Sequence, residues 1–357
     1  MTRILVVAAA SVLLLCCSAM PAAPLHRAWM NPNDSPAVRA AALLKQMTLE
    51  EKVTMLHGPP SGSCCECDEK EGPLCNYTGN IAPNSRLGIP QIKMNDGPQG
   101  FRDNKHPGTS TSWPSALTAA ASWDEELMMA YGVAMGKEFA GKGANVQLGP
   151  GVCIARVPQN GRNFEYLSGE DPFLGYTLVQ PVVQGIQSQG VIADAKHYVL
   201  NNQETNRSAS PSLLETPIPN PLTFCHASCI HLPSPYRVTV SDNADERTRF
   251  ELYYPPFVGA IEAGVGSFMC SYNKIYGSWS CENNSTLAVD LKQRLGFTGF
   301  VMSDWGATHS TSIEAGLDVE MPGADFMGAK LLAAVQAQQI DEAYVDDAGV
   351  AMPFFVF

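Results

Sequence analysis

The sequence feature that most constrains the fold is a series of short apolar segments, each of which ends in polar or glycine-rich residues. These segments are residues 89–100, 144–152, 191–199, 266–273, 299–305 and 315–323. Longer stretches with apolar residues at helical spacing lie between them. Strand and helix patterns that alternate along most of a chain are typical of a parallel α/β architecture.

Local signals set the limits of several predicted helices. The helical stretches are residues 47–56, 122–142, 248–264 and 284–296. Thr48 and Glu51 have the spacing of a capping box at the start of the first stretch. Pro255 and Pro256 predict a break inside the third stretch, and Gly296 predicts the end of the fourth.

Polar side chains collect where successive predicted strands end, among them Asp96, Lys196, His197, Asp304 and Glu320. This placement is typical of the active-site face of a (β/α)8 barrel. A doubly wound sheet would also concentrate function there, but no GxGxxG motif follows a first strand. The glycine-rich stretch 141–151 lacks the lysine and the spacing of a phosphate-binding loop. We therefore predict a TIM-type (β/α)8 barrel.

Charge excludes some classes of partner. The 357 residues carry a net charge of −12, and no run of five Lys or Arg residues occurs. Nucleic acids and anionic membranes are bound by basic patches, so neither is expected as a partner. A neutral or cationic ligand suits this surface better, and no cofactor is implied. The sequence does not indicate an oligomeric state.

The N-terminus has the outline of a secretion signal. Arg3 supplies a positive charge, residues 4–15 are apolar, and residues 17–19 are small enough for cleavage. A dozen apolar residues cannot span about 30 Å of hydrocarbon as a helix. We expect residues 1–19 to be a signal peptide and the protein to be secreted.

Export favours disulfides as the use of the cysteines. A cluster of four contains Cys64, Cys65, Cys67 and Cys75, and it lacks the paired spacing and the histidine of a zinc site. Cys270 and Cys281 flank a stretch with turn character. Nine cysteines remain after the signal, so at least one thiol is unpaired or the chain is not entirely native in sequence. Glycosylation tripeptides begin at Asn33, Asn76, Asn206, Asn283 and Asn284.

Six motifs in order give the sequence a specific resemblance: "MNDGPQGFR", "NGRNFEYLSGEDPFL", "AKHYVLNNQETNR", "DERTRFELYYPPF", "MCSYN" and "GFVMSDWGA". Together they resemble the N-terminal barrel domain of glycoside hydrolase family 3, most closely its β-glucosidases. The resemblance runs from about residue 38 to 340 apart from 210–238. It implies a barrel domain over 20–345, an unmatched Pro-rich insert at 210–238 and an atypical tail at 346–357.

The resemblance implies that Asp304 is the catalytic nucleophile of a retaining β-glucosidase, which cleaves terminal glucosyl residues through a covalent intermediate. Without the resemblance, Asp304 after a buried strand would read as a helix N-cap. Retaining hydrolysis needs one carboxylate to attack the anomeric carbon and a second to protonate the leaving oxygen. We expect cationic neighbours to keep the pKa of Asp304 low. Trp305 offers an apolar face to a sugar ring.

The resemblance also implies the residues that hold the terminal glucose of β-linked glucosides or gluco-oligosaccharides. They are Asp96, Arg162, Lys196, His197, Arg207, Met269 and Tyr272. Each has a structural alternative. Asp96 could start a turn, Arg162 and Glu165 could form a surface ion pair, and Tyr272 could fill the barrel.

The sequence departs from the family pattern in two places. Family members continue into a second α/β sandwich domain that supplies the acid/base glutamate, and neither Glu165 nor Glu170 matches that position. A truncated, catalytically impaired sugar-binding barrel is therefore an alternative function, and a β-xylosidase is another. The insert at 210–238 suggests a gene-model or splicing artefact. An aldolase would need a Schiff-base lysine, for which Lys196 is a weak candidate.

Overall fold

The computed structural model describes residues 27–59, 77–103, 106, 108–204, 207 and 240–352. Several predictions lie outside these ranges. They concern the signal peptide at 1–19, the cysteine cluster at 64–75, the insert at 210–238, the tripeptides at Asn76 and Asn206, and the tail beyond residue 352.

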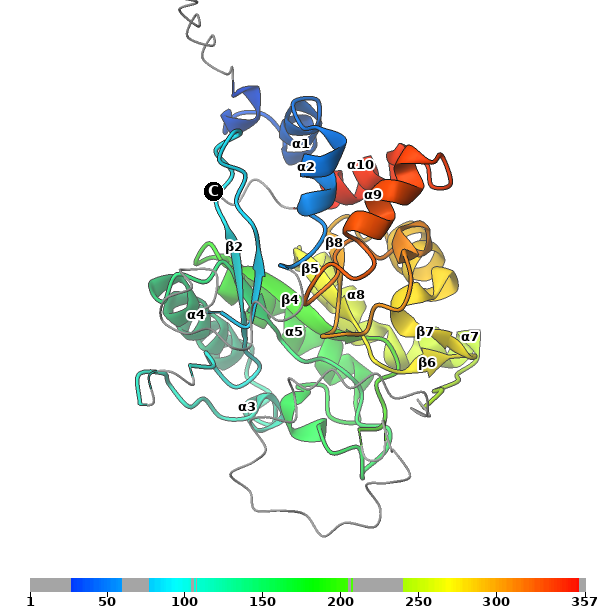
Figure 1. Ribbon diagram of the computed structural model, residues 1–357. Helices are drawn as coiled ribbons and strands as arrows, with labels where there is room; N and C mark the ends of the chain where they lie inside the picture. Colours follow the sequence, from blue (N-terminus) through cyan, green and yellow to red (C-terminus); the bar gives the residue numbers. More distant parts are fainter. Residues whose placement is uncertain are drawn as a thin grey trace, which may run out of the picture.

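The centre of the structure is a curled six-stranded sheet with the order β1-β2-β3-β4-β5-β8 (Figure 1). The strands are β1 (Gly79–Ile81), β2 (Ile92–Asp96), β3 (Val146–Leu148), β4 (Ile192–Tyr198), β5 (Ser267–Cys270) and β8 (Phe300–Ser303). All neighbouring pairs are parallel except β1 with β2. Single parallel bridges, Met302 with Val319 and Glu320 with His57, extend the sheet beyond β8.

The predicted α/β barrel class is confirmed, with two differences from eight regular parallel strands. The first strand runs antiparallel to its neighbour. Residues 315–323 contribute isolated bridges instead of a strand. A small antiparallel hairpin, β6 (Lys274–Ile275) with β7 (Ser278–Trp279), follows β5.

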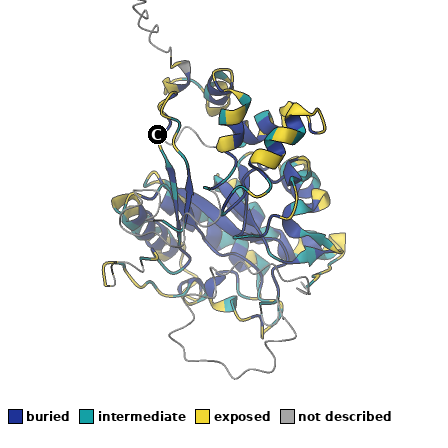
Figure 2. Ribbon diagram, in the orientation of Figure 1, coloured by how far each residue is buried: buried dark blue, intermediate teal, exposed yellow. Residues whose placement is uncertain are grey.

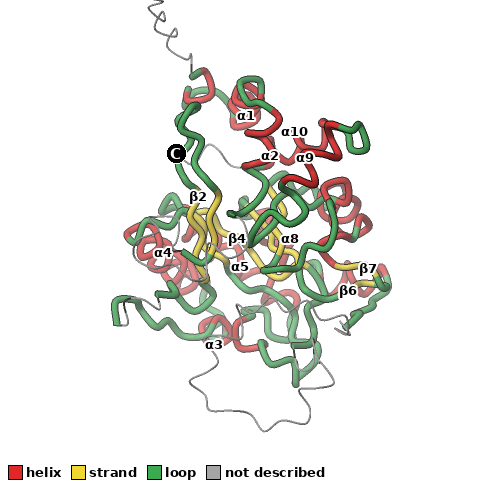
Figure 3. Tube along the Cα trace, in the orientation of Figure 1, coloured by secondary structure: helices red, strands yellow, loops and turns green. Residues whose placement is uncertain are grey.

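Helices surround the strands (Figure 3). The α-helices are α1 (Pro36–Leu44), α2 (Leu49–Thr54), α3 (Ala116–Ala120), α4 (Glu125–Gly141), α5 (Pro172–Gln187), α7 (Glu246–Thr248), α8 (Pro255–Glu262), α9 (Ala329–Gln336) and α10 (Glu342–Ala351). Two π-helical segments are η6 (Arg249–Tyr253) and η8 (Ser285–Arg294), and the 3-10 turns are η1 (Ala28–Met30), η3 (Asn163–Glu165), η7 (Ser280–Glu282) and η9 (Ser312–Ala315). No helix in the described part of the chain is long and apolar enough to cross a membrane.

Several helix limits predicted from the sequence are confirmed. Thr48 and Glu51 form the capping box that begins α2. The prolines separate η6 from α8, which begins at Pro255. Gly296 follows η8 with a φ of +73°, which a residue with a side chain adopts rarely. Lys52 of α2 forms ion pairs with Glu342 and Asp346 of α10, which ties the two ends of the described chain together.

Side chains of the buried strands alternate between two hydrophobic clusters because successive residues of a strand point to opposite faces. Ala193, Ala195, Phe268 and Val301 belong to the cluster between the sheet and the outer helices. Their neighbours Ile192, Met269, Phe300 and Met302 belong to the cluster inside the barrel. Figure 2 shows the strands as the most continuously buried part of the fold. By the same alternation, Asp194 and Lys196 share the inner face with Ile192.

The predicted disulfide use of Cys270 and Cys281 is confirmed, because the two are bonded in the structure. Cys153 is buried with a free thiol, and burial raises the pKa of that thiol to about 12. Among the described tripeptides, Asn33 and Asn284 are exposed. Asn283 is buried and donates a hydrogen bond to the carbonyl of Ile275, so its side chain is not available to a glycan.

Candidate active site

Asp304 stands directly after β8 and is only 6% exposed. Its Oδ1 accepts a hydrogen bond of 2.7 Å from the backbone N–H of Trp305. Its Oδ2 lies 3.3 Å from Nε2 of His197 and has no hydrogen bond of good geometry within the described structure. One carboxylate oxygen is therefore anchored, and the other faces the site.

The expected low pKa of Asp304 is wrong in direction. Burial raises the pKa of this carboxyl group, and the positive charges of Arg162 and Lys196 only partly offset the effect. The Trp305 N–H and the Tyr272 hydroxyl also favour the ionised form. The sequence showed the cations, but the loss of hydration at this depth depends on the assembled fold.

Lys196 and Asp96 form an ion pair between two strands of the inner face. Nζ of Lys196, with only 4% of its side chain exposed, lies 3.1 Å from Oδ1 of Asp96. The other oxygen of Asp96 lies 3.4 Å from Nη1 of Arg102. Burial would raise the pKa of Asp96, but Lys196, Arg102 and Arg162 together lower it. Asp96 therefore stays ionised and can accept hydrogen bonds, and a third of its side chain is open to solvent.

Arg162 connects three partners on the opposite side of the site. It donates to Glu165 through Nε, and its Nη1 lies 3.2 Å from Oε1 of Glu204. Its Nη2 lies 3.3 Å from Nε2 of His197. Glu165 is buried, so the pair with Arg162 is not the surface ion pair that the sequence left open. The two carboxylates fix the guanidinium group beside Asp304.

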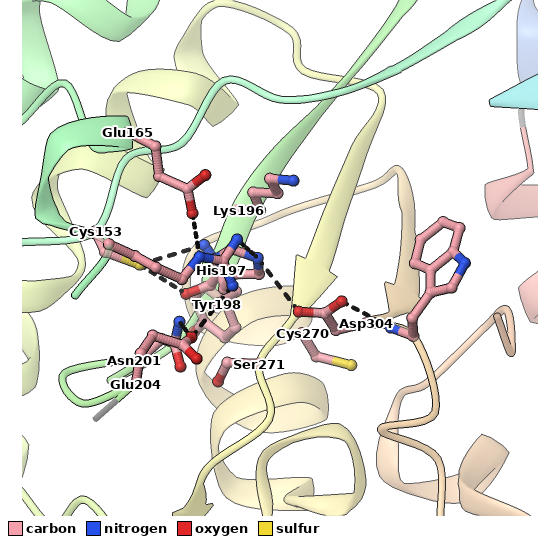
Figure 4. A network of polar contacts seen from close by, with 12 residues as sticks. Cys153, Glu165, Lys196, His197, Tyr198, Asn201, Glu204, Cys270, Ser271 and Asp304 are labelled. Atoms are coloured by element: carbon pink, nitrogen blue, oxygen red, sulfur yellow. Dashed lines mark hydrogen bonds and ion pairs between the residues drawn. The ribbon is translucent and has the colours of Figure 1, made fainter. Parts of the chain in front are cut away.

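His197 is fully enclosed at the centre of this network (Figure 4). Its Nδ1 lies 2.9 Å from the hydroxyl of Tyr166, which in turn accepts from Nδ2 of Asn201 at 3.0 Å. Burial and the neighbouring cations Arg162, Lys196 and Arg207 place the pKa of His197 well below its ordinary value. The ring is therefore neutral.

The remaining predicted residues frame the site. The guanidinium of Arg207 lies 3.6 Å from the ring centre of Tyr272. The hydroxyl of Tyr272 is within hydrogen-bonding reach of Asp304, and burial together with that carboxylate raises the pKa of Tyr272 well above its ordinary value. Trp305 packs on the inner hydrophobic cluster and stands so close to Gly79 that a Cβ there would meet its ring at 2.9 Å. Met269 is buried in the same cluster.

The structure thus brings most of the predicted residues into one network around Asp304, and it adds members that the sequence analysis did not single out. Tyr166, Asn201 and Glu204 come from irregular segments, where no periodicity marks a side chain as inward-facing. The motifs "NFEY" and "KHYVLNNQE" contained them, but only the fold shows that they meet. In the described ranges, no group of three or more His, Cys, Asp or Glu residues is arranged to hold a metal ion.

A cavity of about 540 Å³ is formed by residues that follow Trp305 in the chain. Its lining residues are Gly306, Thr308, His309, Ala324, Asp325, Phe326, Ala329 and Lys330. The hydroxyl of Thr308 is buried there without a hydrogen-bond partner among the described atoms. The cavity is therefore lined by both apolar and polar residues.

Comparison with protein families gives one match that covers most of the chain. The model described as the glycosyl hydrolase family 3 N terminal domain matches residues 44–211 and 236–351.

Named relatives are fungal. "Beta-glucosidase 1" of Aspergillus aculeatus is 39% identical over 322 residues, which are 87% of this chain and 34% of the relative. "Beta-glucosidase cel3A" of Pyricularia oryzae is 37% identical over 324 residues, which are 88% of this chain and 38% of the relative. The chain thus spans about a third of the length of the curated relatives that it matches.

Two solved structures with a similar fold are also those of β-glucosidases. A β-glucosidase of Chaetomium thermophilum has a TM-score of 0.74 and 36% identity, and the match covers 92% of this chain and 37% of that one. The β-glucosidase DesR of Streptomyces venezuelae, solved in complex with D-glucose, has a TM-score of 0.72 and 32% identity, with coverages of 88% and 36%.

Proposed function

This chain belongs to glycosyl hydrolase family 3, and on that premise we propose that it forms the glucose-binding and nucleophile-bearing part of a retaining β-glucosidase. The observation that carries the proposal is the state of Asp304. One oxygen is held by a backbone N–H, and the other is buried without a hydrogen bond of good geometry, under the influence of Arg162 and Lys196. A buried carboxylate oxygen that lacks a hydrogen bond of good geometry is costly, so the arrangement needs a reason, and a sugar carbon is a fitting one.

The proposed first step is a displacement at the anomeric carbon. Oδ2 of Asp304 bonds to that carbon as the glycosidic C–O bond breaks, and the leaving group departs with the electron pair. Water then cleaves the glycosyl–aspartate ester and releases the sugar with Asp304 regenerated. Arg162 and Lys196 stabilise the ionised carboxylate before the attack.

The subsite for the terminal glucose is proposed to use the charged groups around Asp304. Asp96 accepts from sugar hydroxyls, and Lys196 and Arg162 donate to them. Lys196 and Asp96 are already paired at 3.1 Å, so their positions are set before a sugar arrives. Trp305 supplies an apolar face. The cavity at Gly306 would take the leaving group.

No proton donor is proposed among Glu165, Glu204 and Glu320. Glu165 and Glu204 both accept from Arg162, and Glu320 accepts from the backbone N–H groups of Phe326 and Met327. This observation favours the second candidate function, a barrel that binds glucosides but hydrolyses natural ones slowly. General acid catalysis contributes roughly 10²–10⁴-fold, and that factor would be missing.

The test is covalent trapping. The chain is incubated with 2,4-dinitrophenyl 2-deoxy-2-fluoro-β-glucoside, whose leaving group needs no proton, and is then weighed intact and digested. We expect one fluoroglucosyl adduct on the peptide that contains Asp304, and none in Asp304→Asn. Asp318→Asn is the matched control, because Asp318 is also buried but is paired with Lys292 at 2.7 Å.

Two outcomes would reject parts of the proposal. A cooperatively folded chain that binds glucose but forms no adduct would support the sugar-binding alternative. Faster trapping by the corresponding xyloside would support the β-xylosidase alternative.

A further inference from the structure

We propose that Tyr166 and Asn201 are positioning residues that fix the tautomer of His197, so that Nε2 carries the ring proton and faces Asp304. The inference rests on the proposed role of Asp304 as nucleophile. It assigns a function to a buried chain of polar contacts that runs from Glu204 through Asn201, Tyr166 and His197 to Asp304, and that sugar binding does not require by itself.

The donor-to-acceptor direction of these hydrogen bonds is set at Glu204. Glu204 is bound by Arg162 and Arg207, so its carboxylate is ionised and can only accept. The Asn201 group that lies 3.1 Å from Oε1 of Glu204 must therefore be the NH₂ and not the carbonyl. The same NH₂ has a second hydrogen, which points to the hydroxyl of Tyr166 at 3.0 Å.

The Tyr166 hydroxyl then determines which ring nitrogen of His197 accepts a hydrogen bond. Because the Tyr166 hydroxyl accepts from Asn201, its single hydrogen is free to bond to Nδ1 of His197 at 2.9 Å. Tyr166 is completely buried, so no solvent competes for that hydrogen. A neutral ring that accepts at Nδ1 carries its proton on Nε2.

Nε2 has two neighbours at equal distance, and they favour opposite tautomers: Asp304 favours a proton on Nε2 and Arg162 favours a lone pair there, so the chain from Glu204 decides between them. Oδ2 of Asp304 lies 3.3 Å away and can accept, whereas Nη2 of Arg162 lies 3.3 Å away and can only donate. In the opposite tautomer, the lone pair of Nε2 would face the Asp304 carboxylate. Nδ1–H and Asn201 would then both donate to Tyr166, whose own hydrogen would have to turn from the ring to the weakly accepting sulfur of Cys153.

The consequence concerns the orientation of the nucleophile. With a proton on Nε2, that N–H faces Oδ2, 3.3 Å from the ring nitrogen, while the Trp305 N–H holds Oδ1, so each carboxylate oxygen has a donor beside it. Without that proton, the Trp305 N–H and the Tyr272 hydroxyl remain as donors to Asp304, and the lone pair of Nε2 faces Oδ2. The tautomer therefore decides how well Oδ2 is aligned with an incoming anomeric carbon.

The experiment reads the tautomer directly. Long-range ¹H–¹⁵N NMR of the full chain distinguishes protonated from unprotonated ring nitrogens, and the His197 signals are identified by their loss in His197→Asn. We expect the Nε2–H form in the unchanged protein and a mixture of both forms in Tyr166→Phe. Tyr198→Phe is the matched control, because that buried hydroxyl donates to the carbonyl of Thr286 and not to the ring.

Trapping by the fluoroglucoside gives the kinetic readout. Tyr166→Phe should lower the maximal trapping rate about ten-fold, the effect of one hydrogen bond to a charged group, with little change in the half-saturating concentration. Asn201→Ala should act in the same direction and replaces Tyr166→Phe if that variant fails to fold.

Each outcome bears on one idea. A Nδ1–H form in the unchanged protein, or an unaltered Nε2–H form in both variants, overturns the positioning role. An Nε2–H form that responds to the variants in a protein that forms no adduct upholds the positioning of the ring. That result rejects only the nucleophile.

Discussion

Asp194 is a buried acid that the proposed chemistry does not use, and we predict that Asp194→Asn stabilises the fold at alkaline pH. The side chain is completely inaccessible on the inner face of β4. Its Oδ1 accepts from the hydroxyl of Ser267 at 2.6 Å, and its Oδ2 has no partner within the described structure. Ionisation at this position is therefore poorly compensated.

The magnitude follows from the pKa. Burial raises the pKa of Asp194 from 3.8 to about 7, against the opposing influence of Ser267 and Lys196. The folded state thus holds the proton more tightly than the unfolded chain. The resulting penalty is absent below pH 3.8, grows as the pH rises, and is complete above about pH 7. A shift of about three pKa units corresponds to about 4 kcal/mol at full development.

Urea unfolding at pH 5 and pH 8 isolates this contribution. From the same two pKa values, the free energy of unfolding should fall by about 2.5 kcal/mol more in the unchanged protein than in Asp194→Asn between pH 5 and pH 8. The difference arises because the amide does not titrate. Ser267→Ala should enlarge the loss, since it removes the one donor that favours the ionised form. If Asp194→Asn and the unchanged protein show the same pH dependence, Asp194 is hydrated or paired in solution and the reasoning is wrong.

Three further predictions concern the site and the scaffold. As the pH falls, the trapping rate should decline at a pH above the ordinary range of an aspartate, because the pKa of Asp304 is raised. Lys196→Met removes a cation that lowers this pKa, so it should move the decline to higher pH. Gly132→Ala places a Cβ 2.5 Å from a carbonyl oxygen of α5 and should lower the thermal midpoint by several degrees. Replacing Cys270 and Cys281 by Ala opens a loop with a sequence separation of 11 and should cost about 3 kcal/mol in urea unfolding.

The part of the site that the sequence predicts is the part carried by regular strands. Asp96, Lys196 and Asp304 each follow or end an apolar run, and parallel strands bring such positions to one edge. Their convergence could be expected before any coordinates. The antiparallel direction of β1 could not, because a segment of three residues carries no signal of direction.

The pKa of Asp304 shows why the other properties of the site could not be predicted from the sequence. Its cationic neighbours are visible as Arg162 and Lys196 in the motifs, and they do lower its pKa. The larger effect is desolvation, which depends on how many segments cover the carboxyl group and not on any one of them. A sequence pattern shows charges, whereas burial arises only from the sum of the packing.

The alternation of β4 links stability and function in this barrel. A strand has two faces, so the register that points Lys196 at Asp96 also points Asp194 into the inner face two residues earlier. Shifting the register to free Asp194 would turn Lys196 outward and leave Asp96 without its partner. A poorly compensated acid is therefore retained within the same strand that supports the site, and only a change of residue type, not of register, can remove its cost.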